Sequence, residues 1–156
     1  MALELGDRAP SFALEGTHNG VRRTHSIEEH RGRPVMLVFY PGDNTPICTR
    51  QLNAYTADVD QFRDLGLQIL ALSPQGLDSH EEFALDQGGF AFPLLADEDK
   101  AVAQAYGVLG PMGFYRRCIF IIDGEGTLVY VRRGHAASTF RTTDELIRAV
   151  CEATLT

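Results

Sequence analysis

Four apolar runs along the chain have the composition of buried or half-buried strands: 35–40, 67–73, 118–122 and 128–132. The first follows Pro34 and ends before Pro41, so its limits are sharp. The last two flank the turn 123–126, which contains Gly124 and Gly126, and they predict a β-hairpin. The first thirty or so residues are rich in turn formers, and we expect short strands and loops there.

Helical spacing begins directly after the first apolar run and loop. Thr45 followed by Pro46 predicts a helix start, because a hydroxyl cap precedes proline at the first helical position. Gly66 is the predicted end of this helix. Its apolar stripe recurs at spacings of three and four residues: Leu52, Tyr55, Val59 and Phe62.

Three more helices are predicted further along. One covers 78–86 with a cap at Asp78 or Ser79, and another lies near 98–106 and ends at Gly107. The last opens at Thr143 or Asp144, and its expected inward residues are Leu146, Ile147 and Val150. The order of elements predicts an α/β fold of thioredoxin-like order, with a central mixed sheet flanked by helices and an N-terminal β extension. We expect residues 1–156 to form a single domain.

Composition and charge restrict the partners. The chain has 156 residues and a net charge of −7, which argues against nucleic acid or an anionic membrane as partner, since phosphate binding needs a clustered basic face. The apolar runs are too short to cross a bilayer. The first seven residues show no basic region and no apolar signal core, so we expect a cytoplasmic protein.

Cysteine is the candidate chemical residue. The three cysteines, Cys48, Cys118 and Cys151, do not form a disulfide framework, and no two have the C-x-x-C spacing. Cys48 falls in the first turn of the first predicted long helix, where free backbone N–H groups and the helix dipole favour a thiolate. From position alone, a reactive thiol and a small buried hydrophobic residue are both open.

The surroundings of Cys48 carry a resemblance. Pro41, Thr45 and Cys48 stand in the pattern P-x-x-x-T-x-x-C, within the string FYPGDNTPICT at 39–49. This string resembles the active-site motif of the peroxiredoxins, and its form Y-P-x-D-N-T-P-x-C-T looks like the peroxiredoxin Q group, also called bacterioferritin comigratory protein. Further likenesses occur along most of the chain: GDRAPSF at 6–12, Gly32, Gln51, and RCIFIID at 117–123, which is similar to the family's R-x-x-F-x-I-D strand.

The resemblance implies a thiol peroxidase acting on hydrogen peroxide and small alkyl hydroperoxides. Cys48 would be the nucleophile and pass through a sulfenic acid. Backbone N–H groups at the helix start and the Thr45 hydroxyl would contact the substrate oxygens, and Pro41 would shield the thiolate from water. Arg117 would point its guanidinium at the thiolate. Arg116 would face the other way, because adjacent strand residues point to opposite sides.

The route by which the sulfenic acid is reduced stays open. The commonest pattern of the group places a second cysteine five residues after the first, and that position is Asn53. Cys118 should face away from the pocket, and Cys151 lies near the end of the last helix. We therefore expect a one-cysteine enzyme, with thioredoxin or another outside thiol as reductant. The resemblance leaves a monomer or a weak homodimer open.

Other readings remain as alternatives. A peroxide sensor could pass oxidation from Cys48 to a partner protein. A Cys–His hydrolase could pair Cys48 with His80 or His135, but no signature supports it and Arg117 would be unexplained. No cofactor or metal is expected, because the five histidines form no H-x-x-x-H pair and no cluster with carboxylates. We expect His25 and His30, in the turn-rich region, to be solvated.

Overall fold

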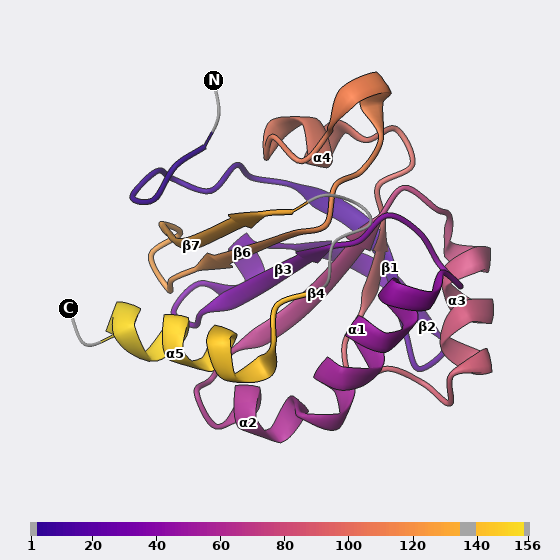
Figure 1. Cartoon of the computed structure of the whole chain (residues 1–156), viewed down its shortest axis with the longest axis horizontal. Helices are drawn as coiled ribbons and strands as arrows, with labels where there is room; N and C mark the ends of the chain where they lie inside the picture. Colours follow the sequence, from indigo (N-terminus) through magenta and orange to yellow (C-terminus); the bar gives the residue numbers. More distant parts are fainter. Residues whose placement is uncertain (1–2, 135–139, 155–156) are drawn as a thin grey trace.

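The computed structural model describes residues 3–134 and 140–154. Within them, one seven-stranded mixed sheet has the order β2-β1-β5-β4-β3-β6-β7 (Figure 1). Its strands are β1 (Ala13–His18), β2 (Val21–Ser26), β3 (Val35–Phe39), β4 (Gln68–Ser73), β5 (Leu94–Ala96), β6 (Cys118–Ile122) and β7 (Leu128–Arg133). The helices are α1 (Pro46–Ala57), α2 (Val59–Arg63), α3 (Leu77–Asp86), α4 (Ala101–Ala105) and α5 (Thr143–Thr154), with 3-10 turns η1 (Glu28–His30) and η2 (Pro111–Gly113).

Side chains alternate between the two faces of the central strands, so the core consists of two layers, one on each face of the sheet. β3 is parallel to β4 and antiparallel to β6, and all five residues of β3 are buried. Met36, Val38 and Tyr40 face one layer together with the buried side chains of α1, α2, α3 and α5. The other residues of the strand face a layer that α4 covers with the N-terminal segment. Figure 1 shows α4 on one side of the sheet and α1, α2 and α5 on the other.

The thioredoxin-like α/β prediction is confirmed, and most predicted elements lie within one or two residues of their expected bounds. Strand β6 and its hairpin with β7 form as expected. In α5, Leu146 and Val150 are buried and Ile147 packs against the same layer. Long apolar runs and a Thr-Pro start are strong local signals, because burial and a fixed φ act on few residues at a time.

The single helix expected to continue to Gly66 is wrong, because the helix breaks at Asp58. The Asp58 carboxylate accepts a hydrogen bond of 2.6 Å from the hydroxyl of Thr143, at the start of α5. Aspartate favours such non-helical positions over a helix interior, since its side chain competes for nearby donors. The predicted apolar stripe still contributes Leu52 and Phe62 to the core, but Leu52 lies in α1 and Phe62 in α2.

Two other helix starts differ from expectation. Asp78 and Ser79 do not cap α3: Gly76 precedes it, the Asp78 carboxylate pairs with Arg22, and the Ser79 hydroxyl bonds to Asp43. Both side chains serve contacts between elements, which sequence spacing does not reveal.

The helix α4 begins at Ala101 rather than near residue 98. The Asp97 carboxylate accepts hydrogen bonds from the backbone N–H groups of Val102 and Ala103, at 3.1 and 2.9 Å. This cap lies beyond the turn 98–100, so the turn residues stay outside the helix. The short strand β5, before this turn, was not predicted. None of the helices in the described residues is both long and apolar enough to cross a membrane.

Candidate active site

Cys48 occupies the third position of α1, with Thr45 as the residue before the helix and Pro46 at its first position. The N–H groups of this first turn have no partner within the helix, so the positive end of the helix dipole lies at the sulfur. The residue is fully buried. Its sulfur is therefore closed off from solvent in this structure.

Arg117 reaches the sulfur from the end of β6. In the antiparallel ladder, Phe39 lies opposite Cys118, so the next pair outward is Tyr40 and Arg117, on the face that α1 covers. Arg117 is 5% exposed, and its Nη2 lies 3.4 Å from Cys48 Sγ. The guanidinium thus places a permanent positive charge and N–H donors against the sulfur.

A chain of hydrogen bonds holds this guanidinium in place. Arg117 Nη1 donates to Gln51 Oε1 at 2.6 Å, and Gln51 Nε2 donates to the hydroxyl of Tyr55 at 3.4 Å. That hydroxyl donates to the carbonyl of Arg141 at 2.6 Å. Gln51 lies one helical turn after Cys48, so both point to the same guanidinium. In the sequence, Gln51 is marked only by the family resemblance and by its spacing of three residues from Cys48.

Arg116 and Cys118 face away from the sulfur, on either side of Arg117. The Arg116 guanidinium donates to the backbone carbonyls of Gly134 and Arg133, at 3.2 and 3.3 Å. Cys118 is buried in the opposite layer of the core, and this burial raises the pKa of its thiol to about 11.

The loop before α1 brings Pro41 and Thr45 to the start of the helix. Pro41 is half-buried and lies two residues after Phe39, the last residue of the β3 ladder. The Thr45 hydroxyl donates to the carbonyl of Gly42 at 3.0 Å rather than capping the helix. The Thr45 carbonyl accepts from both the N–H and the hydroxyl of Thr49.

A buried cluster of polar side chains packs against this loop, and it was not predicted from the sequence. The Asp43 carboxylate accepts hydrogen bonds of 2.7 Å from the hydroxyls of Tyr40 and Ser79, and it lies 2.7 Å from His80 Nδ1. Burial and the Asp43 carboxylate raise the pKa of Tyr40 far above its ordinary value. His80 Nε2 lies 3.0 Å from the carbonyl of Leu95. The expectation that the histidines form no cluster with carboxylates is therefore wrong for His80. It is also wrong for His25 and His30, which are buried and half-buried rather than solvated and lie 3.7 and 3.3 Å from the Glu29 carboxylate.

This cluster also bears on the hydrolase alternative. Both ring nitrogens of His80 are engaged, with Asp43 and with a backbone carbonyl, so the ring is not placed to take a proton from Cys48. His135 lies outside the described residues. Among the described residues, no group of three or more histidine, cysteine, aspartate or glutamate side chains is arranged to hold a metal ion.

The chain is similar to known proteins in sequence and in fold. The sequence profile of the AhpC/TSA family matches residues 5–131, which is most of the chain. The chain belongs to the AhpC/TSA family of peroxiredoxins. It is 32% identical to a peroxiredoxin of Thermoplasma volcanium over 96% of this chain and 74% of that protein. It is also 32% identical to peroxiredoxin-2 of Mus musculus, over 94% and 77%.

Solved peroxiredoxin structures superpose on the whole described fold. Mycobacterium tuberculosis AhpC has a TM-score of 0.88 at 27% identity and covers 99% of both chains. Peroxiredoxins are thiol-dependent peroxidases, and this chain is an enzyme of that class.

Proposed function

We propose that Cys48 is the peroxidatic nucleophile and that it reduces hydrogen peroxide and small alkyl hydroperoxides. The observation that carries this proposal is the 3.4 Å contact between Arg117 Nη2 and Cys48 Sγ, at a helix N-terminus and away from solvent. The thiolate attacks one peroxide oxygen, the O–O bond breaks, and Cys48 becomes a sulfenic acid. The other oxygen leaves as hydroxide or alkoxide and takes a proton to become water or an alcohol.

The surrounding groups act on the charge that moves in this step. Arg117 stabilises the thiolate before attack and the developing negative charge during it. The backbone N–H groups of the first turn of α1 bind the peroxide oxygens, and the Thr45 hydroxyl, held on the Gly42 carbonyl, orients the second oxygen. Pro41 has no N–H group and keeps water away from the sulfur. Because Cys48 is fully buried, a small local movement of the site must admit the peroxide.

The proposed recycling scheme is of the one-cysteine type. Cys118 lies in the opposite core layer from Cys48, with the sheet between them. Asn53 occupies the position five residues after Cys48, and Cys151 is half-buried in α5. An outside thiol, from thioredoxin or another reductant, then attacks the sulfenic acid and releases water as a mixed disulfide forms. A second thiol breaks that disulfide and restores the Cys48 thiol.

The peroxiredoxin subgroup, the number of domains and the oligomeric state are proposed from the sequence motif around Cys48 and from the sheet. The string YPGDNTPICT at 40–49 supports placement in the peroxiredoxin Q group, a single-domain enzyme of the cytoplasm that acts as a monomer or weak homodimer. The seven strands of one sheet support the single domain.

The test measures peroxide turnover with excess dithiothreitol or thioredoxin in three single-cysteine variants. We expect Cys48→Ser to abolish turnover, and Cys118→Ser and Cys151→Ser to retain it within about twofold, since neither thiol takes part in the chemistry. Intact mass after one equivalent of peroxide should show one added oxygen on Cys48, trapped by dimedone. Loss of turnover in Cys151→Ser, or an internal disulfide, contradicts the one-cysteine scheme. A single stoichiometric oxidation without turnover contradicts the enzymatic proposal.

A further inference from the structure

His80 lies in α3 and is a buried histidine that the proposed chemistry does not use. Both of its ring nitrogens lie at hydrogen-bonding distance from an oxygen atom: Nδ1 is 2.7 Å from Asp43 Oδ2, and Nε2 is 3.0 Å from the carbonyl oxygen of Leu95. A backbone carbonyl can only accept, so Nε2 carries a hydrogen. A second hydrogen lies between Nδ1 and Oδ2, because two lone pairs would repel at this distance. The ring therefore links the loop before α1 to β5.

Asp43 belongs to the loop 41–45, which passes beside α3 and ends at the residue before α1 (Figure 1). The geometry of this loop leaves little freedom between Asp43 and Thr45. Asn44 lies between them with φ +61°, in the left-handed region, and the Thr45 hydroxyl donates to the carbonyl of Gly42 at 3.0 Å. A fixed position of Asp43 therefore also fixes Thr45, two residues later.

Among the contacts that Asp43 makes with the described residues, the imidazole of His80 is the one group able to carry a positive charge. The Asp43 carboxylate also accepts hydrogen bonds from the hydroxyls of Tyr40 and Ser79, and its N–H donates to the side-chain oxygen of Gln75. The Asp43 side chain is 1% exposed. A carboxylate buried to this degree is costly without a partner of opposite charge. His80 is therefore the contact whose loss would disturb the loop most.

Tyr40 connects this cluster to the sulfur. Its hydroxyl donates to Asp43 and lies 3.5 Å from His80 Nδ1, and its backbone N–H donates to the carbonyl of Leu72 at 3.0 Å. Burial raises the pKa of Tyr40 far above its ordinary value, and the charges of Asp43 and Cys48 act in the same direction. The hydroxyl that donates to Asp43 is thus close enough to Cys48 to feel its charge.

We infer that His80 is a positioning residue for the peroxidase reaction: it holds Asp43, and through it the loop 41–45 and Thr45, at the start of α1. The inference rests on the proposed roles of Cys48 and Thr45. The ring does not contact the reacting atoms and acts through the loop. A shift of the loop would displace the Thr45 hydroxyl and the N–H groups of the first turn, which bind the peroxide oxygens. Small displacements of such groups cost much of the rate.

Two amide variants separate the two contacts of the ring. In His80→Asn, the side-chain amide nitrogen takes the position of Nδ1, so the contact with Asp43 is kept and the carbonyl of Leu95 loses its donor. In His80→Gln, the amide nitrogen takes the position of Nε2, so the contact with Leu95 is kept and that with Asp43 is lost. Both variants remove the ring and one hydrogen bond, so they differ in the contact that the loop requires.

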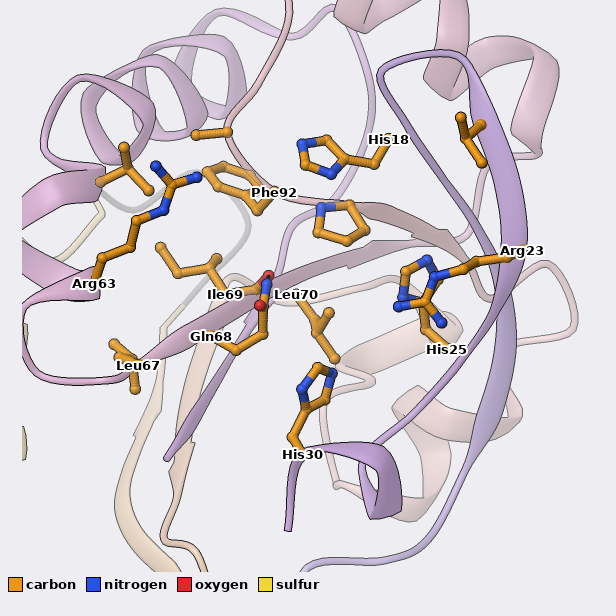
Figure 2. A pocket seen from close by; sticks show the side chains of 14 residues that line it. His18, Arg23, His25, His30, Arg63, Leu67, Gln68, Ile69, Leu70 and Phe92 are labelled. Carbon is orange, nitrogen blue, oxygen red and sulfur yellow. Dashed lines mark hydrogen bonds between the residues drawn. The ribbon is translucent and has the colours of Figure 1, made fainter. Parts of the chain in front are cut away.

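His25→Gln is the matched control for the loss of a buried imidazole beside a carboxylate. The side chain of His25 is 3% exposed, and its Nδ1 lies 3.7 Å from the Glu29 carboxylate. With His18 and His30 it lines a separate cavity of about 290 Å³, and Cys48 is not among the residues around this space (Figure 2). We expect this variant to leave the loop and the reaction unchanged.

Two measurements on the full chain test the inference. Amide hydrogen exchange, read by mass spectrometry in a peptide covering 42–49, reports local opening of the loop. Rapid quenching with hydrogen peroxide and dimedone gives the rate of Cys48 oxidation. His80→Gln should raise the exchange and slow oxidation about tenfold, which corresponds to about 1.4 kcal/mol of barrier. His80→Asn should stay within about threefold of wild type in both.

A milder variant covers the case in which His80→Gln does not fold. Ser79→Ala removes one 2.7 Å hydrogen bond to the same carboxylate oxygen. It should raise the exchange of the loop and slow oxidation about threefold, because a neutral hydrogen bond contributes less than one to a charged partner. Exchange and oxidation at the wild-type rates in Ser79→Ala would then count against the inference.

Two results would overturn the role of His80. One is equal loop exchange or equal oxidation rates in folded His80→Gln and His80→Asn. The other is a His25→Gln variant that slows oxidation as much as His80→Gln. Because exchange is measured without peroxide, the two proposals can fail separately. Faster loop exchange in His80→Gln, together with a wild-type Cys48 that does not react, would support the loop contact and contradict only the proposed function.

Discussion

Replacement of Arg117 by methionine tests the contact on which the proposed chemistry depends. Methionine keeps most of the length of the side chain but removes the guanidinium. The change takes away the 3.4 Å contact with Cys48 Sγ and the 2.6 Å hydrogen bond to Gln51 Oε1. The sulfur then loses the guanidinium beside it, and the side-chain carbonyl oxygen of Gln51 loses a donor.

The size of the effect follows from the kind of contact that is lost. A hydrogen bond to a charged group contributes about 1.5 to 3 kcal/mol. Since each 1.36 kcal/mol of barrier is tenfold in rate, oxidation of Cys48 should slow by about 10- to 150-fold. Arg117→Lys should lie between wild type and Arg117→Met, because lysine keeps the charge but cannot contact the sulfur and Gln51 together.

The assay is rapid quenching of the reduced protein with hydrogen peroxide, followed by dimedone trapping and intact mass. Arg116→Met is the matched control, because that guanidinium donates to the backbone carbonyls of Gly134 and Arg133 and faces away from Cys48. It should oxidise within about twofold of wild type. If a folded Arg117→Met oxidises at the wild-type rate, or if both variants lose the same factor, the proposed role of Arg117 is refuted.

The buried cluster behind the active-site loop and the second core thiol give two further predictions. Asp43→Ala leaves His80 and the hydroxyl of Tyr40 without their acceptor, so the free energy of unfolding in urea should fall by about 3 kcal/mol or more. Ser79→Ala removes one hydrogen bond and should cost about 1 kcal/mol, and equal losses would argue against a shared cluster. Because its pKa is raised to about 11, Cys118 is about 0.1% thiolate near pH 8, and iodoacetamide should label it far more slowly than an unfolded control. Labelling at the unfolded rate, read by peptide mass, would contradict this burial.

Sequence alone predicts the parts of the fold that rest on local signals. The apolar run of β3 and the Thr45-Pro46 start of α1 were placed almost to the residue, since one depends on burial and the other on a fixed φ. Because side chains alternate between the two faces of an extended strand, the sequence alone predicted that Arg116 and Arg117 face opposite sides of the sheet. The identity of the residue at the sulfur also needed the family pattern, because two arginines stand next to each other.

The features that sequence reasoning missed all depend on contacts between different segments of the chain. Asp58 breaks a helix by bonding to Thr143, 85 residues later. Asp97 caps α4 from beyond an intervening turn. His25 was expected to be a solvated turn residue, but it is buried in β2, with its ring against Gly16 of β1 and near the Glu29 carboxylate. Periodicity does not report such pairings, since it describes one element at a time.

The pairing of Phe39 with Cys118 has a consequence for how this protein tolerates insertions. A slip of one residue between β3 and β6 would turn Arg117 toward α4 and point Cys118 at the peroxide site, with the apolar composition of both faces almost preserved. Such a product would keep its secondary structure and lose its chemistry. Residue insertions in the stretch 110–116, just ahead of this ladder, should therefore yield folded but inactive enzyme.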